Sequence, residues 1–199
     1  MSRYWSKAVK ALEPYTPGEQ PRERRYVKLN TNENPYPPSA AVLASARAAC
    51  STDLRLYPDA AATQVRRRLS TLFGLPVDHT IVGNGSDELL SIVLRAFVEP
   101  GQTVAYPCPT YSYYEQLVRI QGGRIGTVDF PADYSLPPDL ASVPARVILL
   151  ANPNSPSGTL IPLDQVAWLA ERVSGILVLD EAYVDFGRGG GTGLIERFP

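Results

Sequence analysis

The chain has 199 residues, 44% of them hydrophobic and 20% charged, and a formal net charge of −1. This composition is typical of a globular protein and gives no electrostatic reason to expect nucleic acid or an anionic membrane as a partner. No apolar run is long enough to span a bilayer, and the N-terminus lacks the apolar segment of a signal peptide. The two cysteines, without metal-site spacing, predict reduced thiols in a cytoplasmic protein, and the single histidine excludes a multi-histidine metal site.

The first part of the chain predicts an arm followed by two helices. Residues 1–38 are rich in proline and charge, which is typical of an extended N-terminal arm, and residues 39–199 are expected to form the main domain. Ser39 should cap an alanine-rich helix over residues 40–49. A second helix, with an arginine-rich face that we expect to be solvated, should run over residues 61–73 and end at a glycine.

Strand and helix patterns alternate through the rest of the chain. The expected elements are strands over residues 80–82, 103–106, 124–128, 147–151 and 176–179, and helices over residues 87–98, 111–121 and 163–173. Such alternation with short connections predicts the α/β class, with a three-layer, mostly parallel sheet flanked by helices. The last strand has four consecutive apolar residues and is expected to be buried on both faces.

This last strand ends in a carboxylate, Asp180. An ionised aspartate at the edge of a core is costly unless a cation or strong donors meet it. In open α/β sheets, ligands bind at the carboxyl ends of the strands. Asp180 is therefore a candidate partner for a cationic group, and Tyr183 can turn its hydroxyl to the same place. The alternative is a helix cap or a structural ion pair.

A glycine-containing turn, Gly83-Asn84-Gly85-Ser86, lies between an expected strand and an expected helix. The helix start offers unpaired N–H groups and the positive end of the helix dipole to an anion such as a phosphate. As a dinucleotide fingerprint the pattern is poor, because Glu88 stands where the third glycine should be. A plain tight turn is an equally good interpretation of these residues alone.

Two further loops follow expected strands. Tyr111, after two prolines, can present its ring face to a planar ligand or simply fill the core. The amides and hydroxyls of residues 152–158 can bond a phenolic or carbonyl oxygen, or form an ordinary polar turn. A flat, phosphorylated, cationic heterocycle would use all four strand-end features. Pyridoxal 5′-phosphate fits that description, since its ring nitrogen stays protonated beside a carboxylate.

The order of these motifs resembles the large domain of the fold-type-I aminotransferases, and within them the histidinol-phosphate aminotransferases. The resemblance covers most of the chain and is carried by Pro14-Tyr15-Thr16-Pro17-Gly18, residues 29–35 (LNTNENP), Tyr57-Pro58-Asp59, residues 83–90 (GNGSDELL), residues 106–111 (YPCPTY), residues 152–158 (NPNSPSG) and Asp180-Glu181-Ala182-Tyr183. Several of these motifs are generic alone, but their ordered combination is specific. It implies an incomplete pyridoxal-phosphate-dependent transferase domain.

The resemblance also implies roles for individual residues. The backbone and side chains of Gly85, Ser86 and Asp87 would hold the cofactor phosphate. Tyr111 would stack on the pyridine ring, and Asp180 would pair with the ring nitrogen.

Around the phenolic oxygen of the cofactor, the chain departs from the family pattern. Tyr183 matches a tyrosine that bonds this oxygen, but the asparagine that usually joins it is replaced by Ser155. Either Asn154 or Ser155 substitutes for that asparagine, or a water does.

Two tyrosines of the first part of the chain match residues that act further away. The tyrosine matching Tyr57 reaches the phosphate of the other subunit's cofactor in such enzymes, which implies a homodimer. The tyrosine matching Tyr15 comes from the N-terminal arm and approaches the substrate.

The family's Schiff-base lysine should lie in a Ser-Lys segment a few tens of residues beyond Asp180, after the last residue, Pro199. The only lysines are Lys7, Lys10 and Lys28. We therefore expect the chain to be the N-terminal portion of such an enzyme and to be inactive by itself.

The function implied for the full-length protein is transamination of histidinol phosphate with 2-oxoglutarate in histidine biosynthesis. An amino-acid-phosphate decarboxylase of the same fold is the alternative enzyme, and a non-catalytic fragment is the alternative for residues 1–199 taken literally. A nucleotide-binding oxidoreductase is disfavoured by the missing third glycine.

Overall fold

The computed structural model describes residues 3–10, 12 and 27–198. The chain divides into two compact units: a smaller unit, Pro14–Val82, and a larger unit made of Met1–Glu13 and Gly83–Pro199. The arm predicted over residues 1–38 lies partly outside the described residues and stays a prediction.

The smaller unit contains the two helices that the sequence predicts. They are α2 (Ala40–Ala49) and α3 (Thr63–Phe73), with the short 3-10 helices η1 (Thr52–Arg55) and η2 (Val77–His79) after each. Ser39 caps α2 as predicted, since its Oγ accepts a hydrogen bond from the N–H of Val42 at 3.3 Å. Gly74 ends α3 with a φ of 71°, a conformation that favours glycine. Neither helix contains a buried residue.

Arg66 corrects the expectation of a fully solvated arginine face on α3. Its Nε donates to the carbonyl oxygen of Thr80 at 2.8 Å, and its Nη2 donates to the carbonyl oxygen of Val77 at 2.9 Å. The same guanidinium is 3.3 Å from a carboxylate oxygen of Asp78. Arg66 therefore ties α3 to the segment that follows it, because backbone carbonyls there need donors.

The strand predicted over residues 80–82 is wrong. The N–H of Thr80 bonds the carbonyl oxygen of Val77 in a turn, and the carbonyl oxygen of Thr80 accepts from Arg66. A strand needs a neighbouring strand to bond its backbone, and no strand among residues 3–10, 12 and 27–198 pairs with this segment. Its apolar residues Ile81 and Val82 are exposed.

The larger unit is built on a parallel sheet, as the alternating pattern predicts. Its described strands are β1 (Thr103–Cys108), β2 (Arg124–Asp129), β3 (Val147–Ala151) and β4 (Ile176–Asp180), in the order β2-β1-β3-β4. All adjacent pairs are parallel. The α/β class is thereby confirmed.

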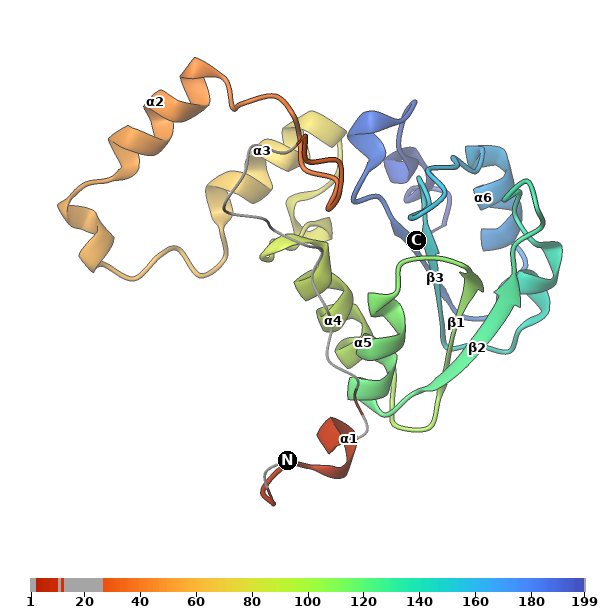
Figure 1. The fold of residues 1–199 in the computed structure, drawn as a ribbon. Coiled ribbons are helices and arrows are strands. Elements are labelled where there is room, and N and C mark those ends of the chain that lie inside the picture. Colours follow the sequence, from red (N-terminus) through yellow and green to blue (C-terminus); the bar gives the residue numbers. More distant parts are fainter. Residues whose placement is uncertain (1–2, 11, 13–26, 199) are drawn as a thin grey trace. The chain divides into compact units, whose positions relative to one another are not determined.

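Helices connect and cover these strands. The elements are α1 (Lys7–Lys10), α4 (Gly85–Phe97), α5 (Tyr113–Gln121), η3 (Pro138–Ser142), α6 (Leu163–Ala170), η4 (Val184–Phe186) and η5 (Gly191–Leu194). Helices α4 and α5 lie on one face of the sheet, and α6 lies on the other (Figure 1). Both ends of α4, α5 and α6 lie within three residues of the predicted bounds.

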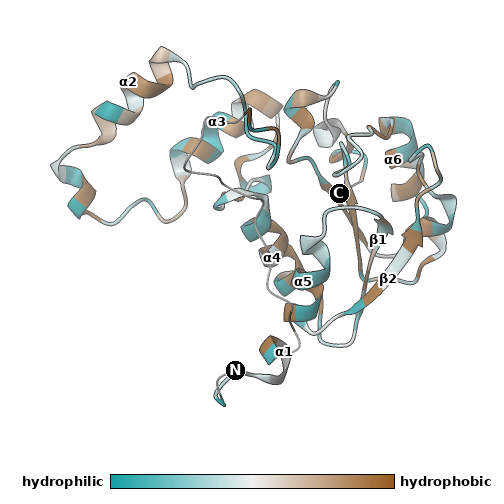
Figure 2. Cartoon of the chain, viewed as in Figure 1, coloured by the Kyte–Doolittle hydropathy of each residue, from teal (hydrophilic) through white to brown (hydrophobic). Residues whose placement is uncertain are grey.

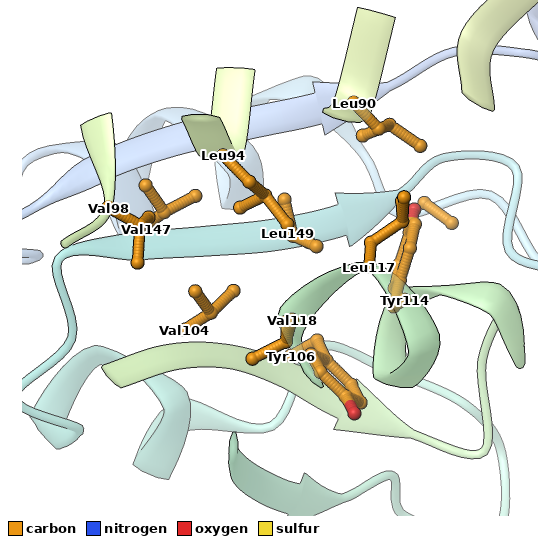
Figure 3. Close-up of a cluster of buried hydrophobic side chains, with 11 residues drawn as sticks. Leu90, Leu94, Val98, Val104, Tyr106, Tyr114, Leu117, Val118, Val147 and Leu149 are labelled. Atoms are coloured by element: carbon orange, nitrogen blue, oxygen red, sulfur yellow. The ribbon is translucent and has the colours of Figure 1, made fainter. Parts of the chain in front are cut away.

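Each face of the sheet has its own apolar cluster. Side chains of α4 and α5 pack on β1 and β3 in one cluster, shown in Figure 3. Side chains of η3 and α6 pack on the opposite face in the other. Figure 2 shows the hydrophobic residues along the strands and on parts of these helices. Strand β3 is buried along its whole length.

Strand β4 differs from its prediction as a strand buried on both faces. All five of its residues are only half-buried. The reason is its place in the sheet: β4 pairs with β3 on one side and forms an edge of the described sheet on the other. An apolar run predicts burial but does not say how many neighbouring strands supply it.

Candidate functional site

Five residues that the sequence predicts for ligand binding line one small cavity in the larger unit. The cavity has a volume of about 50 Å³ and is lined by Ser86, Tyr111, Ala151, Pro153, Ser155, Asp180, Ala182 and Tyr183. Strands β3 and β4 both end there, because Ala151 pairs with Asp180 in the parallel register. Residues far apart in the sequence therefore meet at the carboxyl edge of the sheet, where ligands bind in open α/β folds.

Each carboxylate oxygen of Asp180 accepts a hydrogen bond. The hydroxyl of Tyr114 donates to Oδ2 at 2.7 Å, and the backbone N–H of Ala182 donates to Oδ1 at 3.1 Å. Two donors on an ionised carboxylate offset much of the cost of removing it from water. The side chain that the sequence predicts to meet a cation is thus already held by two neutral donors.

Tyr114 is a site residue that sequence reasoning missed. It lies on α5 and is completely buried. Burial, followed by the nearby Asp180 carboxylate, raises the pKa of its hydroxyl well above the ordinary tyrosine value. The hydroxyl therefore stays protonated and acts as a donor. The signal that could have revealed it is its place on the predicted helix over residues 111–121, three residues after Tyr111, because this spacing puts two residues on one helix face. In the structure α5 begins at Tyr113, and Tyr111 lies just before it.

Tyr111 connects the cavity to the start of α4. Its hydroxyl lies 3.1 and 3.3 Å from the two carboxylate oxygens of Asp87 and donates to that carboxylate. Its ring makes an edge contact with the ring of Tyr114, with centroids 5.6 Å apart. Both ends of the Tyr111 side chain are thus held, which fixes the ring at the cavity wall.

The N-terminus of α4 reaches the same cavity through Ser86. The helix starts at Gly85, whose φ of 82° favours glycine. The Glu88 carboxylate accepts from both the backbone N–H and the side-chain amide of Asn84, which closes the turn in front of the helix. The first N–H groups of a helix lack intrahelical acceptors, so this end favours an anion.

A family model for aminotransferase class I and II matches residues 24–196. The chain belongs to this family.

Named relatives of this aminotransferase chain are histidinol-phosphate aminotransferases. The chain is 44% identical to histidinol-phosphate aminotransferase 1 of Trichormus variabilis over its whole length, which covers 57% of that relative. It is 45% identical to the enzyme of the same name from Bradyrhizobium diazoefficiens, over 94% of the chain and 53% of the relative. The chain therefore spans about half the length of the curated relatives it matches.

Solved aminotransferase structures share the fold. Histidinol-phosphate aminotransferase from Sinorhizobium meliloti, solved in complex with pyridoxal-5′-phosphate, matches with a TM-score of 0.80 and 24% identity, over 94% of the chain and 53% of that structure. An aspartate aminotransferase double mutant from Thermus thermophilus matches with a TM-score of 0.75 and 22% identity, over 90% and 53%. At these identities the likeness establishes the fold alone, which the chain shares with these aminotransferase structures.

Asn154 and Ser155, the two alternatives for bonding a phenolic oxygen, have different surroundings in this aminotransferase chain. Asn154 is buried, and its side chain joins two loops: Oδ1 accepts from Thr110 Oγ1 at 2.8 Å, while Nδ2 donates to the carbonyl oxygen of Pro109 at 3.2 Å and to Ser157 Oγ at 2.9 Å. Ser155 instead lines the cavity. The side chain of Asn154 is committed to protein partners, whereas Ser155 has a place in the cavity lining.

The remaining predicted residues lie elsewhere. Tyr57 belongs to the smaller unit and is fully exposed. Tyr15 lies outside the described residues. No group of three or more His, Cys, Asp or Glu side chains within residues 3–10, 12 and 27–198 is arranged to hold a metal ion. Across the same residues, no helix is long and apolar enough to cross a membrane.

The residues at the cavity fit pyridoxal phosphate chemically. They supply a carboxylate for the ring nitrogen, a helix N-terminus with a serine for the phosphate, and an aromatic ring held between two partners. The cavity of about 50 Å³ is smaller than the roughly 300–1,000 Å³ of typical ligand pockets.

Proposed function

We propose that the larger unit carries the cofactor-binding half of a pyridoxal-phosphate-dependent aminotransferase. The observation that supports this most is the meeting of Asp180, Tyr111, Ser86 and Tyr183 around one cavity at the carboxyl edge of the sheet. A carboxylate, an aromatic ring and a helix N-terminus at one edge suit a ligand with a cationic ring and a phosphate.

Each residue then has a distinct task. Asp180 holds the proton of the ring nitrogen, and Tyr111 covers one face of the ring. Tyr183 and Ser155 bond the phenolic oxygen, since both line the cavity while Asn154 is committed to loop contacts. When bound, the cofactor supplies an electron sink for the carbon that loses a proton.

The phosphate binds at the start of α4, but the side chain of Asp87 does not contact it. A carboxylate repels a phosphate, and that of Asp87 already accepts from the Tyr111 hydroxyl. The phosphate contacts are therefore the backbone N–H groups of Gly85, Ser86 and Asp87 with the hydroxyl of Ser86. The side chain of Asp87 serves to hold the Tyr111 ring.

The names of the relatives favour histidinol phosphate as the amino donor and an aminotransferase over a decarboxylase. We assign 2-oxoglutarate as the amino acceptor in a cytoplasmic pathway of histidine biosynthesis. In a homodimer, the exposed Tyr57 reaches the phosphate in the partner subunit, and Tyr15 approaches the substrate.

Residues 1–199 alone should not transfer amino groups. The described residues that line the cavity include no lysine, so the amine that would tether the cofactor has to come from elsewhere in the whole protein. Tethering holds the reacting aldehyde near the substrate amine, and a large part of the rate depends on that proximity. Residues 1–199 incubated with pyridoxal phosphate, histidinol phosphate and 2-oxoglutarate should give no glutamate.

The test of the function uses the whole purified protein with pyridoxal phosphate, histidinol phosphate and 2-oxoglutarate. We expect formation of glutamate and consumption of histidinol phosphate in equal amounts, without release of carbon dioxide. Carbon dioxide release from an amino-acid phosphate, without glutamate, would assign the decarboxylase instead. Glutamate formation with aspartate but not with histidinol phosphate would keep the aminotransferase and overturn the substrate.

A further inference from the structure

We propose that Tyr114 is a positioning residue that fixes the rotation of the Asp180 carboxylate, so that one oxygen faces the ring nitrogen of the bound cofactor. The inference rests on the proposed function, because it gives Tyr114 a role only if Asp180 holds the ring nitrogen. It begins from one contact between residues on different elements, the hydrogen bond of 2.7 Å from the Tyr114 hydroxyl to Asp180 Oδ2.

A carboxylate at the end of a strand needs more than one contact to be oriented. Rotation about the last bond of an aspartate side chain is broad and has no strong intrinsic preference. The Ala182 N–H holds Oδ1 at 3.1 Å, but a single donor leaves the carboxylate plane free to turn about that contact. The Tyr114 hydroxyl holds the second oxygen, so both ends of the carboxylate are fixed before a ligand arrives.

Tyr114 is itself placed rigidly. It is completely buried, and its ring makes edge contacts with Tyr106 and Tyr111 at centroid distances of 5.7 and 5.6 Å. Figure 3 shows its hydroxyl beside the end of the strand that carries Leu149. Because close packing fixes the Tyr114 hydroxyl, the Asp180 carboxylate keeps this hydrogen bond only in one orientation.

Tyr114 acts through Asp180 and not on the ligand. It does not belong to the lining of the cavity, whereas Asp180 does. Its hydroxyl remains protonated over the working pH range because burial and the neighbouring carboxylate raise its pKa. Tyr114 can therefore neither take nor supply the proton that moves in the reaction. Its contribution is geometric, and it concerns the ring nitrogen alone.

This selectivity defines the test. The ligand-free whole protein is titrated by calorimetry with pyridoxamine 5′-phosphate and with its 1-deaza analogue, which carries carbon in place of the ring nitrogen. The ratio of the two affinities measures the Asp180 contact. We expect the natural probe to bind roughly tenfold or more tightly than the analogue, as one charge-assisted hydrogen bond gives. Tyr114→Phe should reduce this ratio about threefold to tenfold and leave the affinity for the analogue unchanged.

Tyr106→Phe is the matched control. It removes the hydroxyl of another buried tyrosine in the same cluster and leaves the hydrogen bond to Asp180 in place. Its affinity ratio should equal that of the wild type. Both variants keep the aromatic ring, and circular dichroism of the ligand-free proteins verifies that they fold.

The outcomes separate this inference from the function on which it rests. Equal loss of affinity for both probes in Tyr114→Phe would make Tyr114 a structural residue and overturn the inference. An unchanged ratio in Tyr114→Phe, with the ratio lost in Asp180→Asn, would also overturn it but leave the proposed role of Asp180 intact. A wild-type ratio near one would remove the assigned role of Asp180, and the inference with it.

Discussion

The two units of the chain differ in how far their described residues bury their own apolar side chains. In the larger unit, two apolar clusters cover both faces of the sheet, and the carboxyl edge brings five predicted ligand-binding residues to one cavity. In the smaller unit, α2 and α3 have no buried residue, and apolar side chains such as Leu54 and Tyr57 are exposed. Since helices in proteins gain most of their stability from packing, we expect the described helices of the smaller unit to be stabilised less by their own contacts than those of the larger unit.

The largest effect should come from the carboxylate at the edge of the sheet in the larger unit. Asp180→Asn keeps the side-chain shape but loses the charge that holds the ring nitrogen protonated. In the whole protein we expect transamination to fall by on the order of 100-fold or more, measured as glutamate formation, while the folded structure persists. Asp185→Asn is the control, since Asp185 is an exposed carboxylate five residues further on. Near-normal turnover in Asp180→Asn would contradict the assignment.

A pair of leucines compares the two units directly. Leu149→Ala empties space in the middle of the buried strand β3 and should lower the free energy of unfolding of residues 1–199 by about 2–5 kcal/mol. Leu43→Ala on α2, where the leucine is exposed, should change it by less than about 0.5 kcal/mol.

Denaturant unfolding followed by circular dichroism measures both leucine variants. Repeating the pair in the whole protein sharpens the comparison. If other parts of that protein cover α2, the cost of Leu43→Ala should rise there while the cost of Leu149→Ala stays the same. Equal costs of the two substitutions in residues 1–199 would remove the distinction between the units.

The start of α4 should contribute to cofactor affinity more than to folding. Ser86→Ala removes a hydroxyl at the cavity and should weaken binding of pyridoxal phosphate by about 1–3 kcal/mol, because the acceptor is a charged phosphate. The measurement is a calorimetric titration of the whole protein, with thermal unfolding at saturating cofactor as the folding control. Ser91→Ala, on the same helix but away from the cavity lining, should bind normally. Unchanged affinity in Ser86→Ala would place the phosphate elsewhere.

The smallest expected effect concerns Arg66, a side chain of the smaller unit with several hydrogen bonds. Arg66→Ala removes the guanidinium that bonds the carbonyl oxygens of Val77 and Thr80, and should lower the free energy of unfolding by about 1–2 kcal/mol. Arg67→Ala removes the exposed neighbouring arginine and should be nearly neutral. Urea unfolding compares the two variants, and equal effects would restore the solvated-face interpretation.

Much of the fold and of the cavity was predictable because both depend on local patterns. The alternation of apolar runs and helical stripes predicts β1, β3 and β4, and a parallel sheet brings their carboxyl ends together. Asp180 could be singled out for the same reason, since a carboxylate directly after an apolar strand is visible in the sequence. The family resemblance added roles for these residues.

The remainder depends on contacts that no local pattern encodes. Whether residues 80–82 form a strand depends on a neighbour, and the backbone of Thr80 is taken by Val77 and Arg66 instead. The side-chain partner of Asp180 is Tyr114, which is 66 residues away in the sequence, and no local pattern shows that the two residues will meet. Similarly, adjacent polar residues such as Asn154 and Ser155 have the same turn character, and only the folded loop separates the buried one from the one at the cavity.

The side chain of Asn154 has a consequence for motion. By bonding Thr110 and Pro109 from the loop after β3, it joins that loop to the segment after β1, which carries Tyr111. Neither loop can open without breaking hydrogen bonds of the buried Asn154 side chain, so the two should fluctuate as one cooperative unit. Tyr111 and Ser155, one from each loop, both line the cavity and should therefore keep their spacing as the loops move.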